Sequence, residues 1–130
     1  MKKELQEKLY EKYDWLFKDK DLPMTQTCMC WGLCVGDGWY DLLEETCRRI
    51  AAVDPEHIVV FDQVKEKFGG LRIYYHLEAG GTGEYDEPIF QIINEAEDKS
   101  YKICEVCGKP GTPNNRGWIT TLCEECRNTE

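Results

Sequence analysis

Two closely spaced cysteine pairs lie near the C-terminus of the sequence. Cys104 and Cys107 form one CxxC pair, Cys123 and Cys126 form another, and fifteen residues separate them. Zinc prefers four soft ligands in a tetrahedron, and a CxxC pair brings two sulfurs to one ion from a single tight turn. The spacing therefore predicts one structural zinc ion held by these four thiolates. Because the protein would supply all four ligands, no open coordination position would remain for catalysis.

The residues between the two pairs support this interpretation. Gly108 directly follows the first pair, where a metal-binding knuckle needs a permissive backbone angle. Most of the segment consists of turn-forming residues, and residues 118–122 are expected to form a short strand that returns to the metal. A dithiol redox motif is the alternative, but such a motif usually occurs singly near a βαβ pattern.

Four further cysteines lie in the first half of the chain, namely Cys28, Cys30, Cys34 and Cys47. They could bind a second metal ion, but their spacing is irregular and alternate strand residues face opposite sides. Cys47 also falls on the apolar stripe of an expected helix. Buried cysteine commonly behaves as a small hydrophobic residue, so core packing is the expectation for this group. A second metal site, and less so a disulfide, stay open as alternatives.

Groups that could carry catalysis are sparse. The chain has only two histidines, His57 and His76, and Ser100 is its sole serine. A Ser-His-Asp triad would have to use Ser100, which falls within an expected helix and is poorly placed as a nucleophile. A Cys-His pair using one of the N-terminal cysteines carries no local signature. The sequence therefore favours a non-catalytic protein over an enzyme.

The chain is acidic, with a formal net charge of −9 over 130 residues. Phosphate backbones repel such a chain unless its positive charge is segregated, which disfavours nucleic acid as a partner. No apolar run approaches the roughly 18 residues of a membrane span. The first residues lead into a polar amphipathic stretch that lacks the apolar core of a signal peptide. We therefore expect a cytoplasmic protein without membrane contact.

Apolar periodicity predicts three helices and one hairpin. The helices are expected over residues 3–19, from the Gly36-Asp37-Gly38 turn up to Asp54-Pro55, and onward from Pro88, with an inward face that ends at Ser100. The strands are expected over residues 58–68 and 71–78, on either side of a Gly69-Gly70 turn. The first strand is irregular enough for a bulge, and residues 24–35 are expected to be a buried extended segment.

These elements predict an α+β fold. A domain of helices and a β-hairpin, residues 1–103, would be followed by a zinc ribbon or zinc-knuckle module, residues 104–130. Because Ile103 leads into the first cysteine pair without a linker, the module is expected to pack on the domain. Zinc would stabilise a C-terminal segment that is too small to hold itself together.

Basic and aromatic side chains cluster around the expected hairpin turn. Lys65, Lys67 and Arg72 lie near Phe68 and Tyr74, a composition suited to nucleic acid or another polyanion. The patch holds few charges and Glu66 interrupts it, so an ordinary solvated face is the favoured interpretation. Large apolar residues beside turns, such as Trp39 and Trp118, are more often core than contact residues. Trp118 is nevertheless retained with Lys65, Lys67 and Arg72 as a candidate contact for a partner.

Three segments together resemble small uncharacterised proteins encoded by bacteriophages and prophages. They are Gly36–Leu43, Gln63–Tyr74 and the Cys104–Cys126 module with Gly117-Trp118-Ile119. The resemblance covers residues 36–126 and leaves the first 35 outside, including three of the N-terminal cysteines. It implies a bacterial cytoplasm, where small phage proteins often bind and redirect host machinery, and it supplies no mechanism.

We therefore expect a non-catalytic zinc-binding protein that binds a host protein through its hairpin and zinc module. A bacterial defence component is one candidate partner. One alternative is a nucleic-acid-binding regulator that uses the hairpin patch together with Lys109 and Arg116. A second is a sponge for a small nucleotide in a pocket lined by Trp and Tyr. An acidic surface would also suit a mimic of DNA.

Overall fold

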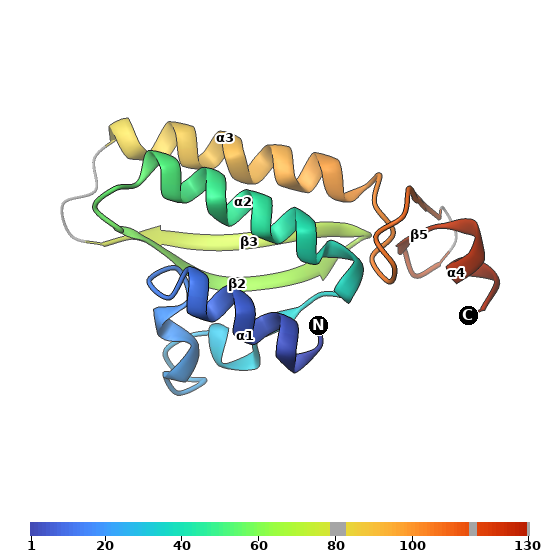
Figure 1. Cartoon of the computed structure of the whole chain (residues 1–130), viewed down its shortest axis with the longest axis horizontal. Coiled ribbons are helices and arrows are strands. Elements are labelled where there is room, and N and C mark those ends of the chain that lie inside the picture. The colour runs from blue at the N-terminus through green and yellow to red at the C-terminus, as the bar shows by residue number, and fades with distance from the viewer. Residues whose placement is uncertain (79–82, 115–116, 130) are drawn as a thin grey trace.

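The chain folds as a mixed α+β structure, as the sequence predicts. The computed structural model describes residues 1–78, 83–114 and 117–129, without the side chains of residues 83–85 (Figure 1). The helices are α1 (Lys3–Lys12), α2 (Tyr40–Val53), α3 (Gly83–Ser100) and α4 (Glu124–Asn128), with 3-10 turns at Lys18–Asp21, Met29–Trp31 and Asp37–Trp39. None of the helices in this described part is long and apolar enough to cross a membrane.

The main sheet has three strands in the order β1-β2-β3. Strand β1 (Leu33–Cys34) pairs parallel to β2 (Val59–Lys67), and β2 pairs antiparallel to β3 (Gly70–Leu77). The register between β2 and β3 shifts between Phe61 and Gln63, which confirms the predicted bulge. A second sheet in the C-terminal segment joins β4 (Thr112–Pro113) to β5 (Thr121–Leu122), so the expected return strand is only two residues long.

One core gathers side chains from α1, α2, α3 and the hairpin. Its fully buried members include Leu9, Trp39, Leu43, Phe61 and Ile89. Helix α2 lies between α1 and α3 along the hairpin (Figure 1). The inward face predicted for the third helix is confirmed. Ile89, Ile92, Ala96 and Ser100 are buried, and Ile93 is half-buried.

The hairpin turn lies one residue earlier than predicted. Its two central residues are Phe68, with φ 55°, and Gly69, with φ 83°, and Lys67 pairs with Gly70. Positive φ at both central residues matches the right-handed twist of the two strands. The sequence expectation placed the glycine pair in the turn, but Gly70 instead belongs to β3, where an added Cβ would meet the hydroxyl of Tyr101 at 2.5 Å.

The N-terminal expectations were wrong in two places. Helix α1 ends at Lys12 instead of near residue 19, because the chain turns there and buries both Leu16 and Phe17 completely. The carbonyl of Leu16 then accepts a hydrogen bond from the amide of Phe61 at 2.8 Å. Residues 24–35 form turns in place of a buried extended segment. Trp31 remains 64% exposed, and only Leu33–Cys34 is a strand.

The third helix also begins earlier than predicted. It starts at Gly83, so Pro88 lies inside the helix and not at its first position. Pro88 is the sixth residue of the helix, where proline removes one backbone hydrogen bond and its ring crowds the carbonyl four residues earlier. The helix nevertheless extends through Pro88 toward its N-terminus.

Candidate metal centre

The sulfur atoms of Cys104, Cys107, Cys123 and Cys126 converge on one point. All four lie within 4.8 Å of one another, and the sulfurs of Cys107 and Cys123 are 3.6 Å apart. Four thiolates at about 2.3 Å from a tetrahedral zinc ion would be about 3.8 Å apart. The group is therefore spaced to hold a metal ion, with every ligand supplied by the protein.

Each cysteine pair is shaped by backbone hydrogen bonds. The amide of Gly108 donates to the carbonyl of Cys104 at 2.9 Å, and the amide of Cys104 donates to the carbonyl of Lys109 at 2.7 Å. Gly108 has φ 82°, which confirms the need for a permissive residue after the first pair. In the second pair, Cys123 precedes α4 and its sulfur accepts from the amide of Cys126 at 3.4 Å.

The backbone around the sulfurs favours negative charge at one of them. Burial by itself would raise the pKa of Cys104. Hydrogen bonds from the backbone of Cys123, Cys107 and Val106 outweigh burial and lower the pKa to about 6. Hydrogen bonding with Cys123 and burial raise the pKa of Cys126 to about 12. The cluster thus favours a thiolate at Cys104, while a thiolate at Cys126 needs a cation to balance its charge.

The C-terminal segment has little apolar core of its own. Its buried cluster consists of Cys104, Leu122 and Cys123, with Cys126 packed against it. Its sheet joins strands of only two residues each. So small a core does not offset the conformational entropy of ordering the segment, and a bound metal would supply the missing free energy.

The segment is attached to the main domain through Gly36, Gly38 and Trp39. The amide of Gly38 donates to the carbonyl of Glu105 at 2.7 Å, and the amide of Gly36 donates to the Glu105 carboxylate at 2.9 Å. The indole nitrogen of Trp39 donates to the carbonyl of Ile103 at 2.8 Å. Gly38 lies so close that an added Cβ would be 2.1 Å from the Cys104 carbonyl oxygen.

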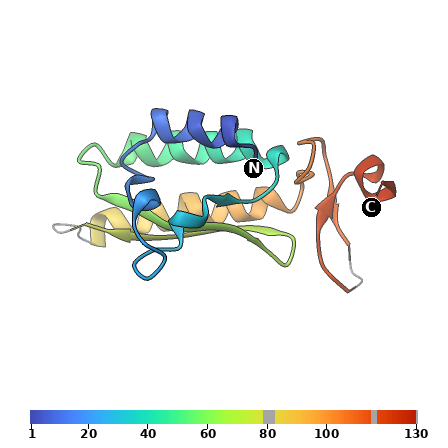
Figure 2. The same ribbon diagram turned by 90° about the horizontal axis from the view of Figure 1, so that it is seen from below.

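A second attachment joins the segment to the hairpin. The hydroxyl of Thr121, which is fully buried, donates to the carbonyl of Gly69 at 2.6 Å. The carbonyl of Thr121 in turn accepts from the amide of Glu105 at 3.0 Å. In two views the segment stands at one end of the molecule beside the hairpin turn (Figures 1 and 2). The C-terminal segment therefore contacts the rest of the chain at two places.

Residues of Gly36–Leu43 and of Gln63–Tyr74 contact the C-terminal segment at this junction. Glu105 and Thr121 were not among the residues singled out from the sequence. Both lie within one or two residues of a ligand cysteine, and that proximity is the only sequence signal for them. Their partners, Gly38 and Gly69, are distant along the chain.

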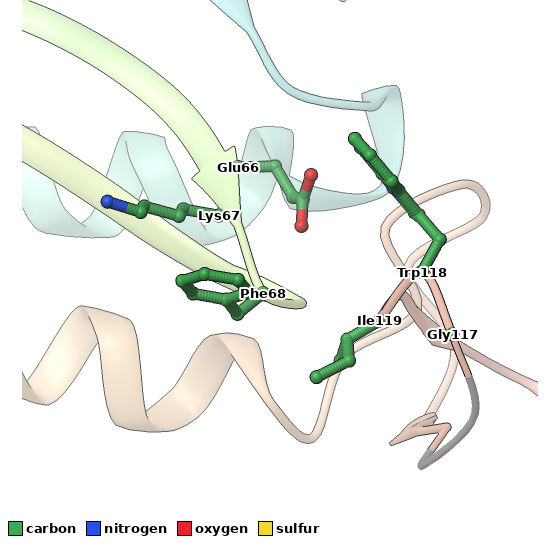
Figure 3. Close-up of a pocket in the computed structure, with 6 residues that line it drawn as sticks. All are labelled: Glu66, Lys67, Phe68, Gly117, Trp118 and Ile119. Carbon is green, nitrogen blue, oxygen red and sulfur yellow. The ribbon is translucent and has the colours of Figure 1, made fainter.

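A hollow of about 200 Å³ lies between the hairpin turn and the metal segment. It is lined by Glu66, Lys67, Phe68, Gly117, Trp118 and Ile119. Ile119 extends toward Phe68, the Glu66 carboxylate points into the gap, and Trp118 stands on the far side (Figure 3). Phe68 is 62% exposed and Trp118 is 82% exposed. Trp118 is thus a surface residue, against the expectation that it would be core, while Trp39 is buried as expected.

The predicted basic patch is only partly assembled. Lys65 and Arg72 are cross-strand partners, as the hairpin requires. Arg72 lies 3.5 Å from the Glu97 carboxylate, which balances its charge. The ammonium groups of Lys65 and Lys67 lie 5.8 and 5.6 Å from the ring centres of Tyr74 and Phe68. Lys109 pairs with Glu125 at 3.3 Å, and Arg116 lies outside the described residues.

The N-terminal cysteines do not form a second thiolate centre in the described structure. The described structure brings potential metal ligands together in only two groups. Neither group contains Cys28, Cys30, Cys34 or Cys47. Cys47 is fully buried, as expected, and burial raises its pKa. Cys28 and Cys34 are exposed, so the expectation of core packing was wrong for them. Met29 and Leu33 of the same segment are buried in the core, while Cys28 and Cys34 lie at its surface.

A larger open hollow, of about 430 Å³, adjoins α1. Its lining includes Tyr10 and Trp31, the residue types expected of a nucleotide pocket, together with Lys3 and Lys20. Glu7 and Asp21 line it as well, and the Asp21 carboxylate lies 3.2 Å from the Lys20 ammonium. Equal numbers of acidic and basic side chains leave little net attraction for phosphate.

Comparisons with protein-family models, curated proteins and solved structures find no match to this chain.

Proposed function

We propose that this chain is a non-catalytic protein-binding module ordered by one structural zinc ion. Cys104, Cys107, Cys123 and Cys126 hold the ion. The partner is a protein that inserts an apolar side chain between Phe68 and Trp118. The resemblance to phage-encoded proteins favours a protein of the bacterial host, and a component of host defence is one candidate.

The chemistry of the four thiols supports zinc. Tetrahedral sets of four soft sulfur donors suit zinc or iron–sulfur chemistry, and paired CxxC knuckles on turns are typical of structural zinc. All four ligands come from the chain, which leaves no position for a substrate. The role of the zinc ion is therefore to order residues 104–129.

The pair of exposed aromatic side chains is the observation that carries the binding proposal. Phe68 and Trp118 lie on separate segments that the Thr121–Gly69 hydrogen bond holds together. Large aromatic side chains beside a hollow are characteristic of interaction hot spots. An isolated exposed aromatic residue needs no explanation, but two that line one hollow do.

The charge of the chain specifies the chemistry of the partner further. With a net charge of −9, the module attracts basic surfaces and repels acidic ones over distances of about a Debye length. The Glu66 carboxylate lies at the hollow itself. The fitting partner surface is therefore an apolar side chain surrounded by Lys or Arg.

Capture from a bacterial lysate by immobilised variants tests the proposal. Trp118→Ala and Phe68→Ala should lose a protein that the unmodified chain captures. Trp31→Ala and Phe90→Ala should retain it, because they remove aromatic residues of similar exposure elsewhere (64% and 59%). The captured protein is then purified and its binding measured directly by calorimetry. Equal capture by all five proteins, or capture of nothing by the unmodified chain, would refute a binding role for this hollow.

The two alternatives have separate tests. A nucleic-acid regulator would be retained on heparin, with binding that weakens steeply as salt rises and that Lys65→Ala reduces. The Arg72–Glu97 pair argues against this reading because it balances one of the three cations. A nucleotide sponge would release heat on titration with nucleotides, and Trp31→Ala would abolish that heat. The balanced charges of the α1 hollow argue against it.

A further inference from the structure

A second group of potential metal ligands lies far from the cysteines in sequence. Asp19, Asp62 and His76 each offer one ligand atom, and these atoms lie within 4.8 Å of one another. The Nδ1 atom of His76 is 2.6 Å from a carboxylate oxygen of Asp62. The three residues are separated by 43 and 14 positions along the chain, so no spacing motif reveals them.

Tertiary structure brings the three residues together from three elements. Asp19 lies in the 3-10 turn after α1, which the Leu16–Phe61 hydrogen bond fastens to the edge of β2. Asp62 is the residue at the bulge of β2, and a bulge redirects a side chain relative to a regular strand. His76 lies on β3, opposite Val60.

The surroundings have an excess of negative charge. The Nε2 atom of His76 lies 3.8 Å from a carboxylate oxygen of Glu78, and Glu78 pairs with Lys18. Around the imidazole there are thus three carboxylates against one ammonium group. Histidine that binds a metal through one ring nitrogen usually directs the other toward a carboxylate. The Glu78 carboxylate lies on the Nε2 side of His76, beyond hydrogen-bond distance.

We propose that Asp19, Asp62 and His76 form a second cation site, for a divalent transition metal that accepts mixed nitrogen and oxygen ligands. One imidazole with two carboxylates suits Mn²⁺, Fe²⁺ or Zn²⁺ better than Ca²⁺ or Mg²⁺, which prefer oxygen alone. Ligand atoms about 2.1 Å from a metal lie about 3 to 4 Å apart. The three ligand atoms here lie within 4.8 Å of one another, so shifts of about 1 Å would complete the set. The side chains of His76 and Asp62 are 41% and 43% exposed, which leaves room for water at the remaining positions.

A metal at this site would tie the turn after α1 to both strands of the hairpin. That turn is otherwise held to the sheet edge by few polar contacts, including the Leu16–Phe61 hydrogen bond. A ligand that binds only the folded state stabilises it in proportion to the logarithm of its concentration. Bound metal should therefore slow proteolysis of residues 13–22 and raise the melting temperature.

Titration with Mn²⁺ tests the site without interference from the cysteines, because Mn²⁺ prefers oxygen and nitrogen to thiolate ligands. The full chain, loaded with zinc, is titrated while electron paramagnetic resonance follows the free Mn²⁺ signal. One equivalent should bind saturably. Asp62→Asn and His76→Gln should each weaken binding at least about tenfold. Asp98→Asn, which removes an exposed carboxylate from α3, should leave binding unchanged.

Circular dichroism and the zinc content of each variant confirm that the fold is retained. If the free Mn²⁺ concentration always equalled the total Mn²⁺ added, no ion would be bound and the proposal would be overturned. Equal weakening by Asp62→Asn and Asp98→Asn would also overturn the proposal, because it would show that only general charge attracts the ion. The readout is independent of the cysteine centre, so the result does not depend on the proposed binding function.

Discussion

The amide of Gly38 donates a 2.7 Å hydrogen bond to the carbonyl of Glu105, across 67 positions of sequence. This contact places the turn that opens α2 directly against the first cysteine pair. Because Gly38 lacks a side chain, the backbone of Cys104 can approach it closely. The metal segment is therefore seated by backbone contact with the main domain and not by a large apolar interface.

Gly38→Ala should destabilise the protein strongly. The added Cβ would lie 2.1 Å from the Cys104 carbonyl oxygen, and backbone atoms on both sides cannot yield easily. We expect a loss of about 2–3 kcal/mol in the free energy of unfolding, measured by urea denaturation. Gly117→Ala is the matched control. Gly117 has φ 51°, but none of the described atoms comes within 4 Å of its Cβ position, so only about 1 kcal/mol should be lost.

Removal of the metal should unfold the C-terminal segment selectively. After treatment with a chelator, amide hydrogen exchange should accelerate across residues 104–129, because their buried cluster is too small to persist alone. The amides of α2 and β2 should keep their protection. Cys107→Ser should reproduce the effect, and Cys28→Ser, at another exposed cysteine, should not. Unchanged protection after complete metal loss would contradict a structural role.

Thr121→Val should loosen the attachment to the hairpin. Valine keeps the shape of threonine but leaves the buried carbonyl of Gly69 without its 2.6 Å donor. An unsatisfied buried acceptor costs about 1–3 kcal/mol, which urea denaturation would detect. Thr121→Ser keeps the hydroxyl and should lose less of the free energy of unfolding than Thr121→Val. Equal losses for the two variants would show that packing, and not the hydrogen bond, holds the hairpin to the segment.

Phe68→Asn should stabilise the fold while weakening partner binding. Phe68 has φ 55°, a conformation that asparagine adopts more easily at the first central position of this kind of turn. The phenyl ring is largely exposed, so its loss costs little, and we expect a gain of about 1 kcal/mol in urea denaturation. Phe68→Ala should lose binding without that gain. If both variants stabilised the fold, the gain would come from removing the phenyl ring and not from easing the backbone conformation of residue 68.

Glu44 should contribute to stability only above acidic pH. A 2.6 Å hydrogen bond from the Lys12 ammonium outweighs burial and holds the pKa of Glu44 below its ordinary 4.5. A lowered pKa in the folded state gives stability that is present above pH 4.5 and is lost as pH falls through the folded value. Glu44→Gln should therefore lose about 1 kcal/mol at pH 7 and match the unmodified chain in acid. Glu11→Gln, at an exposed residue of α1, is the control and should lose nothing at either pH.

Local patterns identified most of the regular elements correctly. The apolar stripe of α2, the inward face of α3 and the two strands all arise from residues close together in sequence, where periodicity reports burial directly. The errors fall where distant contacts decide the outcome. Helix α1 stops at Lys12 because Leu16 and Phe17 are both drawn into the core, and the hairpin turn moves to Phe68 because Gly70 is needed beside Tyr101.

The sequence by itself determined which four cysteines cluster and how they pair, because a CxxC knuckle is built from neighbouring residues. Only the tertiary structure decided that Phe68 and Trp118 would line the same hollow and that Asp62 would meet His76 at a bulge. Those relationships join segments many residues apart, and their distances are set by how helices and strands pack. Packing is a property of the whole core, so no short stretch of the chain encodes it.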